Sequence, residues 1–534
     1  MKTWANVNAL YQIYPRSFKD SNKDGVGDLR GIIENLDHIR SKHHSLGIDA
    51  IWISPFFTSP MVDMGYDVSN YCDVDPIFGT LEDFKELVEQ AHLRGIKLVI
   101  DFVPNHTSSE HPWFQEALSN PSSDKRNYYI WRKPGAGGGV PNNWVSLFGG
   151  SAWEFDGKSG EYYLHSFFKE QPDLNWENPQ VREEMKKVLR FWLDLGVDGF
   201  RMDAVNHMAK DLEHFRDEPL REGGVEGTYD GHVRKYTKFG PQLVPYLQEL
   251  ADVVESYPDK KIFFEAIVDG SLGSVAEQFR RLYDVNPRIA VPFNFGGLWT
   301  AWGAKPYGDY IREFEGMIKP GDISAYCFSN HDQPRIASRF GRQQARIIAM
   351  LTLTLPGVPT VYYGDEIGME NVPITPDQRT DMSYQEGIFG GRDPFRTPMQ
   401  WDATEYSGFS SVKPWLPLAK DYKKRNIKTE RHQADSVFTL YRHLLFIRNR
   451  DETMIKGDYK EHLIDEKKNV LVYERNYESS SYIVALNFSN RIRRVRVPYK
   501  AHHVVLRTQP TKQPKVRVHG WVTLRPYEGL ILYV

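Results

Sequence analysis

Cysteine, strong net charge and unbroken apolar runs are all scarce in this chain. Its 534 residues include only two cysteines, Cys72 and Cys327. Two cysteines do not make a disulfide framework and are typical of a reducing compartment. The formal net charge is only −3 and no basic stripe is present, so we expect no nucleic-acid partner.

Membrane-directed segments are missing as well. Residues 1–6 have no apolar stretch of the kind that signal peptides carry. The most apolar run, residues 347–363, contains Pro356, Gly357 and Pro359, which predicts a core helix, a turn and a strand. That run is too broken for a membrane span. We therefore expect a soluble, cytoplasmic protein without a membrane partner.

Strand and helix patterns alternate over the first 450 residues. A capping-box pattern at Thr80 and Asp83 begins one helix, which runs into a strand over 97–101. A helix from Asn178 to Gly196 precedes a strand that ends near Asp203. Further strands are expected at 9–14, 50–53, 261–265, 324–329 and 360–363. Repeated units of this kind predict an α/β fold, a closed (β/α)8 TIM barrel.

Two regions depart from the alternation of strands and helices. A chain of this length is expected to form two or three domains. Residues 104–171 are rich in Gly, Pro, Asn and Trp and predict a loop-rich subdomain inserted after strand 3. Residues 455–534 consist of short alternating segments, which predict a C-terminal antiparallel β-sandwich domain. The barrel is then formed by residues 1–103 and 172–454.

Two predicted strands end in a carboxylate. Arg201 and Asp203 lie two residues apart and share a face, so the arginine is expected to lower the pKa of Asp203 and keep it ionised. Glu265 follows Phe263 and Phe264, an apolar setting that raises a carboxyl pKa and suits a proton donor. Glycoside hydrolysis uses such a pair of carboxyl groups, one ionised and one protonated. Either residue alone could equally be a helix cap or a salt-bridge partner.

Three more polar clusters follow predicted barrel strands. They are residues 65–67 (Gly-Tyr-Asp), 101–106 (Asp-Phe-Val-Pro-Asn-His) and 329–332 (Ser-Asn-His-Asp). Histidine and aspartate together can hold sugar hydroxyls with charge-assisted hydrogen bonds. Each cluster alone could be a loop anchor. Their shared position at the carboxyl ends of barrel strands favours an active site, because catalytic groups gather on that face.

With these motifs in place, the whole sequence resembles glycoside hydrolase family 13, the α-amylase family. The four signature regions match residues 101–106, 199–203, Glu265 and 330–332. Residues 171–175 (Gln-Pro-Asp-Leu-Asn), 391–393 (Gly-Arg-Asp) and 396–401 (Arg-Thr-Pro-Met-Gln-Trp) are similar to the α-glucosidase and oligo-1,6-glucosidase branch. Phe264 departs from the small residue that often precedes the acid.

The resemblance implies a role for each matching residue. Asp203 would be the nucleophile, Glu265 the acid/base, and Asp332 the third carboxylate, which holds the distorted sugar. His106, Arg201 and His331 would contact the sugar, Asp67 and Arg392 would close its subsite into a pocket, and Phe148 and Phe167 would flank the scissile bond. The implied substrate-binding set is Tyr66, Asp67, His106, Phe148, Phe167, Arg201, Ala204, His331 and Arg392.

Ala204 bears on the linkage that is cleaved. In relatives that resemble this chain, valine after the nucleophile accompanies α-1,6 cleavage, whereas alanine or threonine accompanies α-1,4 cleavage. We therefore expect a retaining, exo-acting α-glucosidase that hydrolyses maltose and short malto-oligosaccharides and needs no organic cofactor. The alternatives are a transglucosylase, an oligo-1,6-glucosidase or a sucrose isomerase of the same branch. A more distant one is the non-enzymatic heavy chain of an amino-acid transporter.

A structural metal is the remaining expectation. Residues 20–28 resemble the first nine positions of a calcium loop, with oxygen ligands at alternate positions and Gly25 at the sixth. The glutamate of a complete EF-hand is absent at Gly31. The family resemblance implies a Ca²⁺ ion, or alternatively Mg²⁺, held by Asp20, Asn22, Asp24, Asp28 and the Val26 carbonyl. A metal-free turn is the competing interpretation.

Overall fold

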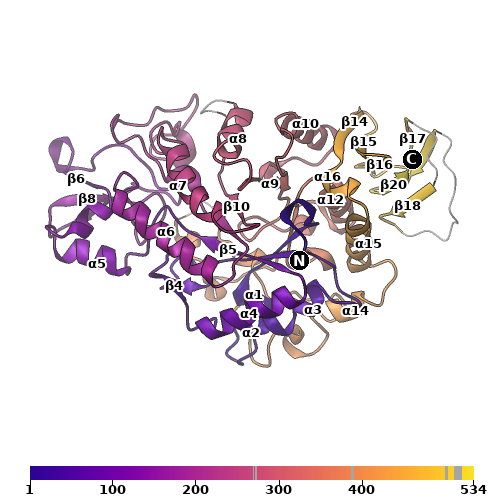
Figure 1. Ribbon diagram of the computed structural model, residues 1–534, viewed down its shortest axis with the longest axis horizontal. Coiled ribbons are helices and arrows are strands. Elements are labelled where there is room, and N and C mark those ends of the chain that lie inside the picture. Colours follow the sequence, from indigo (N-terminus) through magenta and orange to yellow (C-terminus); the bar gives the residue numbers. More distant parts are fainter. Residues whose placement is uncertain (269, 271–273, 387–389, 499–502, 510–519) are drawn as a thin grey trace.

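A closed parallel barrel forms the centre of the molecule (Figure 1). The computed structural model describes residues 1–534 except 269, 271–273, 387–389, 499–502 and 510–519. The strand order is β12-β11-β10-β9-β5-β2-β1-β13. A parallel bridge between Cys327 and Thr360 joins the two ends of this order and closes the ring. The predicted (β/α)8 barrel is confirmed.

The barrel strands are short and buried. They are β1 (Leu10–Ile13), β2 (Ala50–Ile53), β5 (Lys97–Phe102), β9 (Gly199–Met202), β10 (Lys261–Phe264), β11 (Ala290–Asn294), β12 (Ala325–Tyr326) and β13 (Thr360–Tyr362). Trp52, Val99 and Phe263 belong to one apolar cluster, and the flanking Ile51 and Ile100 belong to another. This alternation is the two-residue period of a strand buried on both faces. The expected strand at 324–329 is reduced to the two residues of β12.

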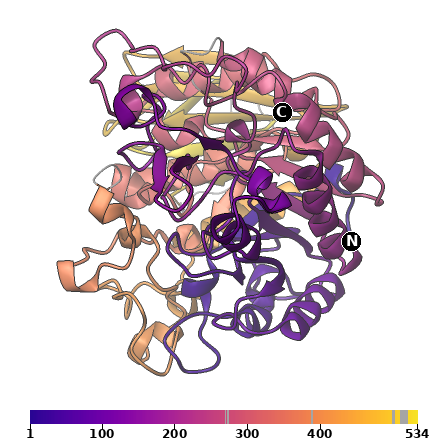
Figure 2. The same cartoon turned by 90° about the vertical axis from the view of Figure 1, so that its left-hand side faces the viewer.

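Helices lie outside the barrel (Figures 1 and 2). The longer ones are α4 (Leu81–Leu93), α5 (Pro112–Ser119), α6 (Pro179–Asp194), α7 (Leu243–Glu255), α8 (Val275–Tyr283), α10 (Ala304–Glu315), α12 (Arg342–Thr354) and α15 (Val437–Arg450). Helix α4 begins with the predicted capping box, because Thr80 accepts from the Asp83 amide and Asp83 accepts from the Thr80 amide. Asn178 caps α6, whose first residue is Pro179.

Shorter helices connect these elements. They are α1 (Pro15–Phe18), α2 (Leu29–Glu34), α3 (Leu36–Ile39), α9 (Gly296–Trp299), α11 (Ile336–Phe340), α13 (Ser383–Glu386), α14 (Ile427–Glu430) and α16 (Thr453–Lys456). Strands β3 (Phe57–Thr58) and β4 (Asn70–Val74) pair after β2. The long connection from β5 to α6 holds α5 and a small sheet of β6 (Trp131–Arg132), β8 (Glu161–Leu164) and β7 (Trp153–Asp156). This inserted region lies at the left end of Figure 1.

The C-terminal strands form two antiparallel sheets at the opposite end of the molecule (Figure 1). The larger contains β14 (Asp458–Asp465), β15 (Val470–Tyr477), β16 (Ser480–Asn487), β20 (Gly529–Tyr533) and β18 (His503–Arg507). The smaller pairs β17 (Arg493–Arg496) with β19 (Trp521–Leu524). Leu471 and Tyr473 pack into the main core, whereas Val470 and Val472 pack with Val495 of β17. The large sheet therefore lies between the barrel and the small sheet.

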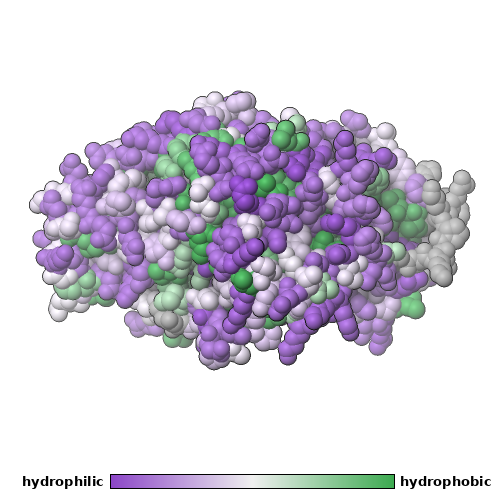
Figure 3. Space-filling model, turned by 90° about the horizontal axis from the view of Figure 1, so that it is seen from below, coloured by the Kyte–Doolittle hydropathy of each residue, from purple (hydrophilic) through white to green (hydrophobic). Residues whose placement is uncertain are grey.

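The surface is mostly polar on the face drawn in Figure 3, with smaller apolar areas between charged side chains. Within the described part of the chain, no helix combines the length and apolar character needed to span a bilayer.

Candidate active site

The two predicted catalytic carboxylates meet at the carboxyl ends of neighbouring barrel strands. In the register of β9 with β10, Arg201 lies beside Phe263 and Met202 beside Phe264. Asp203 and Glu265 each come one residue later, so both leave the barrel on the same rim. The Glu265 amide donates to the Met202 carbonyl at 2.9 Å, and the register continues to that point.

A cavity opens at this rim and contains all three predicted catalytic carboxylates. Its lining also includes seven of the nine predicted substrate-binding residues, from elements far apart in the sequence. The lining residues used below are Asp63, Tyr66, His106, Phe148, Phe167, Arg201, Asp203, Ala204, Glu265, Ile267, Leu298, Trp299, Asp332 and Arg392. His331 is fully buried and meets the cavity through Tyr66 and Asp332. Asp67 is the other residue of the nine that is not part of this lining.

Asp67 does not take the place that the sequence suggested. Its two carboxylate oxygens accept hydrogen bonds from Ser59 Oγ and from the amides of Val62 and Asp63. These bonds stabilise the turn, and within the described residues Asp67 is not part of the cavity wall. Asp63 lies there instead, 2.6 Å from Arg392 Nη2. In this loop Asp63 is thus the acid that pairs with Arg392, and the expected part of Asp67 in closing the subsite stays a prediction.

Arg201 connects the carboxylates on the barrel side of the cavity. Its Nη1 atom lies 2.7 Å from Asp203 Oδ1 and 2.7 Å from Asp101 Oδ1, and its Nη2 atom lies 3.8 Å from Glu265 Oε2. The side chain is 3% exposed, so solvent does little to screen these interactions. The Tyr66 hydroxyl accepts from Nη1 at 3.2 Å. One guanidinium thus orients three acidic groups.

The protonation of Asp203 and Glu265 follows from burial and from Arg201. Burial raises the pKa of Asp203 well above its usual value, and Arg201 opposes but does not reverse the shift. The expected low pKa of Asp203 is therefore wrong in its net direction. Burial likewise raises the pKa of Glu265. Two buried carboxyls this close favour sharing one proton. Arg201 lies nearer to Asp203 than to Glu265, which favours the negative charge of the pair on Asp203.

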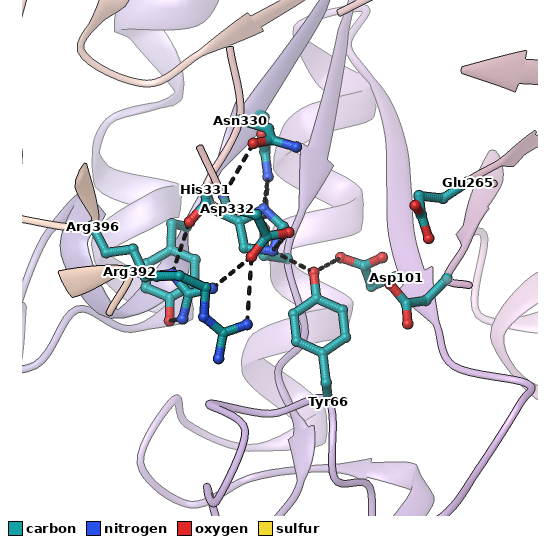
Figure 4. Close-up of polar contacts among 12 residues, drawn as sticks. Tyr66, Asp101, Glu265, Asn330, His331, Asp332, Arg392 and Arg396 are labelled. Atoms are coloured by element: carbon teal, nitrogen blue, oxygen red, sulfur yellow. Dashed lines mark hydrogen bonds and ion pairs between the residues drawn. The ribbon is translucent and has the colours of Figure 1, made fainter. Parts of the chain in front are cut away.

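Asp332 lies between two arginines on the other side of the cavity (Figure 4). Its Oδ1 atom is 2.8 Å from Arg396 Nη2 and 3.5 Å from Arg392 Nη1. Burial acts to raise the pKa of Asp332, but His331, Arg396 and Arg392 together hold it below its usual range. Asp332 is therefore ionised at neutral pH and can accept charge-assisted hydrogen bonds from a ligand.

His331 and His106 are held as neutral rings. Burial lowers the pKa of His331 to about 3 and that of His106 to about 4. The amide nitrogen of Gln12 donates to His331 Nδ1 at 2.7 Å, which leaves Nε2 as the protonated nitrogen facing Tyr66, 2.7 Å from its hydroxyl. His331 also stacks on the Tyr66 ring at 5.6 Å. Both rings are thus neutral, and the protein itself supplies hydrogen-bond partners for their nitrogens.

Aromatic side chains form an apolar wall. Phe148, Phe167 and Ala204 pack in one cluster, and Phe148 stacks on Phe168 with ring centroids 3.8 Å apart. Phe167 also packs on His106 at 5.0 Å. Flat apolar rings beside charged groups are suited to the faces of a pyranose ring.

Sequence reasoning missed four buried side chains that complete the site. Asp63 and Gln171 hold each other, and Gln171 also contacts His106. Arg396, part of the quoted Arg-Thr-Pro motif, holds Asp332. Asp381 accepts two hydrogen bonds from the Arg392 guanidinium. Asp63 could have been found as a second acid in the loop before Tyr66, but no motif pointed to Asp381.

The suggested calcium loop does not gather its carboxylates around one point. Both oxygens of Asp28 accept from Ser21, and Oδ1 also accepts from the Gly31 amide as the cap of α2. Asp20 accepts from Lys23 and Gly25. In the described ranges, no group of three or more His, Cys, Asp or Glu side chains is arranged to hold a metal ion. The geometry thus gives the expected Ca²⁺ or Mg²⁺ no support, and the ion stays a prediction.

Comparison with known proteins agrees with this geometry. Residues 12–457 match the alpha amylase catalytic domain. An oligo-1,6-glucosidase of Parageobacillus thermoglucosidasius is 38% identical over 548 residues, covering 95% of this chain and 94% of the relative. An alpha-glucosidase of Apis mellifera is 39% identical over 499 residues, covering 90% and 84%. The crystal structure of an alpha-glucosyl transfer enzyme, XgtA, superimposes over 100% of both chains with a TM-score of 0.92 and 34% identity.

A parallel barrel that places two carboxyls side by side at its carboxyl rim has the groups that a glycoside hydrolase requires. With the matches just described, the chain belongs to the α-amylase family, glycoside hydrolase family 13, and acts on α-glucosides.

Proposed function

We propose that the protein is a retaining, exo-acting α-glucosidase that releases glucose from maltose and short malto-oligosaccharides. The observation that carries the proposal is the buried charge cluster at one end of the cavity. There Arg392 is paired with Asp63 and lies 3.5 Å from Asp332. Asp63 and Arg392 are 4% and 6% exposed, so this end leaves no path for a longer chain and accepts a terminal sugar.

The chemistry that we propose uses one carboxyl for attack and one for proton transfer. Glu265 donates its proton to the glycosidic oxygen while Asp203 attacks the anomeric carbon, and the leaving sugar departs. Glu265, now ionised, removes a proton from water, which displaces Asp203 and releases glucose. Asp332 and Arg392 hold the hydroxyls of the bound glucose. Arg201 stabilises Asp203 as an anion before attack and after hydrolysis.

The preference for α-1,4 bonds is supported by Ala204. It lines the cavity beside both carboxyls, and its small side chain leaves room for a 4-linked leaving sugar. Hydrolysis rates on maltose, isomaltose, sucrose and p-nitrophenyl α-glucoside test the proposal, and maltose should be cleaved faster than isomaltose. No glucose from any of the four would overturn the glucosidase assignment. A preference for isomaltose would instead indicate an oligo-1,6-glucosidase.

Glucosyl transfer is a second candidate, favoured by the apolar mouth of the cavity. Ile267, Leu298 and Trp299 line the cavity, and Trp299 is 54% exposed. Such a surface can bind an acceptor sugar or alcohol that competes with water. Product analysis at high maltose concentration distinguishes the two activities. Hydrolysis yields glucose alone, whereas transfer yields longer oligosaccharides, or sucrose isomers when sucrose is the substrate.

A further inference from the structure

Asp381 is a buried carboxylate outside the cavity that no motif of the sequence marks. It lies just before α13 and is 3% exposed. Its Oδ2 atom accepts from Arg392 Nε at 2.8 Å, and its Oδ1 atom accepts from Arg392 Nη2 at 2.8 Å. Oδ2 also accepts from the Arg392 backbone amide at 2.7 Å. Two parallel bonds of this kind fix both the position and the plane of a guanidinium.

Asp381 and Asp63 engage most of the side-chain N–H groups of Arg392, which determines the groups that remain for a ligand. The single Nε hydrogen goes to Asp381, and the two Nη2 hydrogens go to Asp381 and Asp63, the latter at 2.6 Å. A guanidinium has five N–H groups, so two remain, both on Nη1. Among the described residues, the charged neighbour of Nη1 is Asp332, at 3.5 Å. Nη1 is therefore the edge of Arg392 that faces the cavity.

The ion pair between Asp381 and Arg392 persists at neutral pH because of the charges around Asp381. Burial acts to raise the pKa of Asp381, but Arg392 holds it far below its usual value. The carboxylate therefore keeps its charge. Phe148 lies against the guanidinium, whose carbon is 5.5 Å from the ring centroid. Arg392 is thus held from behind by Asp381, from the side by Asp63 and from one face by Phe148.

We propose that Asp381 is a positioning residue for substrate recognition: it fixes Arg392 so that Nη1 alone is presented to a hydroxyl of the terminal glucose. The inference rests on the proposed function, in which this end of the cavity binds that glucose. It goes beyond the proposed function by assigning ligand affinity to a side chain that does not touch the ligand. Asp381 should affect binding of the glucosyl unit more than the chemical step.

Asp381 also has partners in its own loop. They allow its contribution to local stability to be separated from its effect on the orientation of Arg392. It accepts from the Ser383 amide at 3.1 Å and from Ser383 Oγ at 2.7 Å. Ser383→Ala removes the hydroxyl bond but leaves all three bonds between Asp381 and Arg392. This variant is the control for local stability, because it weakens the loop without releasing the guanidinium.

The test compares wild type, Asp381→Asn, Asp381→Glu and Ser383→Ala by melting temperature and by kcat and KM on p-nitrophenyl α-glucoside. The inhibition constant of D-glucose is measured in parallel. In Asp381→Asn we expect KM and the glucose inhibition constant to rise together by about 10–100-fold, which is what the loss of a hydrogen bond to a charged group is worth. The value of kcat should change much less. Asp381→Glu restores the charge and should recover part of the affinity, and Ser383→Ala should keep wild-type affinity.

A double-mutant cycle decides whether Asp381 acts through Arg392. A lysine side chain has no planar guanidinium for Asp381 to orient. Adding Asp381→Asn to the Arg392→Lys variant should therefore not raise KM further. Wild-type affinity in folded Asp381→Asn, or equal and additive effects in both backgrounds, would overturn the inference. If Asp381→Asn does not fold, Asp381→Glu in the same two backgrounds decides in its place.

The proposed function can fail separately. Wild type that cleaves no α-glucoside contradicts the glucosidase assignment, and calorimetric binding of D-glucose to the same variants then tests Asp381 directly. Absence of glucose binding in the wild type would overturn both.

Discussion

The amide of Ala204 donates a hydrogen bond to Glu265 Oε2, with 2.5 Å between the nitrogen and the oxygen. The residue after the nucleophile thus holds the carboxyl that is expected to donate the proton. The backbone adds a second connection, since the Val205 amide donates to the Glu265 carbonyl at 3.0 Å. With Oε2 occupied as an acceptor, we expect Oε1 to carry the proton in the proposed mechanism. The segment that follows Asp203 is therefore joined to Glu265 by two hydrogen bonds.

Ala204→Val should shift linkage preference toward α-1,6 bonds. The two γ-methyl groups of valine fill space that a 4-linked sugar needs, whereas a 6-linked sugar reaches past on its extra CH₂. A misfit of this size is worth about 1–3 kcal/mol, or about 10–200-fold in the ratio of kcat/KM values. The ratio of maltose to isomaltose hydrolysis measures the shift.

The backbone at this position adds a second expected effect of valine. Ala204 has φ of 47°, in the left-handed region that a β-branched residue rarely adopts. We therefore expect Ala204→Val to lose about 1–3 kcal/mol of stability as well. Ala204→Gly is the matched control, since glycine accepts this φ and adds no methyl groups. An unchanged substrate ratio in a folded Ala204→Val variant would count against the steric account of linkage.

Replacing Glu265 should affect poor leaving groups most. Glu265→Gln keeps the shape of the side chain and loses the transferable proton, so departure of glucose from maltose should slow by about 10²–10⁴-fold. Departure of p-nitrophenolate needs little protonation, so bond cleavage in p-nitrophenyl α-glucoside should slow far less. Pre-steady-state release of p-nitrophenol, compared with maltose turnover, measures the difference. Equal losses on both substrates would remove Glu265 from the role of acid.

The histidines predict how stability depends on pH, and His111 offers a test away from the cavity. Its Nδ1 accepts from the Trp113 amide at 3.1 Å as the cap of α5, which requires the neutral ring. Burial, with a contribution from Lys125, lowers its pKa to about 4. The unfolded chain takes up this proton near pH 6.5. Between pH 6.5 and 4 the unfolded state therefore binds more protons, and stability falls as the pH falls.

At pH 5 this difference amounts to about 2 kcal/mol for His111 alone. His111→Asn retains a side-chain cap without a titrating group. Denaturant unfolding should give the two proteins similar stability at pH 7.5, with a smaller loss at pH 5 for the variant. Parallel curves at all pH values would show that the proton is not excluded from His111 in the folded state.

Chelation tests the metal prediction. If residues 20–28 bind Ca²⁺, EDTA should lower the melting temperature, and added Ca²⁺ should restore it, because an ion that binds the folded state stabilises it. Asp24→Asn should abolish this response. Since the loop lies outside the cavity lining, kcat should not change while the protein is folded. A melting temperature that neither EDTA nor Ca²⁺ changes would contradict the metal prediction. Residues 20–28 would then be a metal-free turn, in which Asp20 and Asp28 serve as hydrogen-bond acceptors.

Local rules predicted much of the fold. The capping box at Thr80 and the cap at Asn178 followed from spacing alone, since both depend on neighbours in sequence. The antiparallel C-terminal strands followed from alternation. The shortness of β12 did not follow from the sequence. The strand ends at Tyr326, and the ring closes through the isolated β-bridge between Cys327 and Thr360, which depends on tertiary contacts.

The site was predictable where a motif placed a residue at a strand end, as for Asp203 and Glu265. It was not predictable where two similar residues share one loop, as Asp63 and Asp67 do. The choice between them depends on which carboxylate accepts backbone amides, a three-dimensional fact. The raised pKa of Asp203 escaped prediction for a related reason, because the extent of burial decides it.

The stereochemistry of the first product tests the central claim most directly. Wild-type enzyme and p-nitrophenyl α-glucoside are followed by proton NMR within the first minutes, before the anomers of glucose equilibrate. Attack by Asp203 followed by attack of water inverts the anomeric carbon twice, so α-glucose should accumulate first. Asp203→Asn should lose several orders of magnitude in rate in the same assay. Initial release of β-glucose would contradict the double displacement and, with it, the assignment of Asp203 as nucleophile.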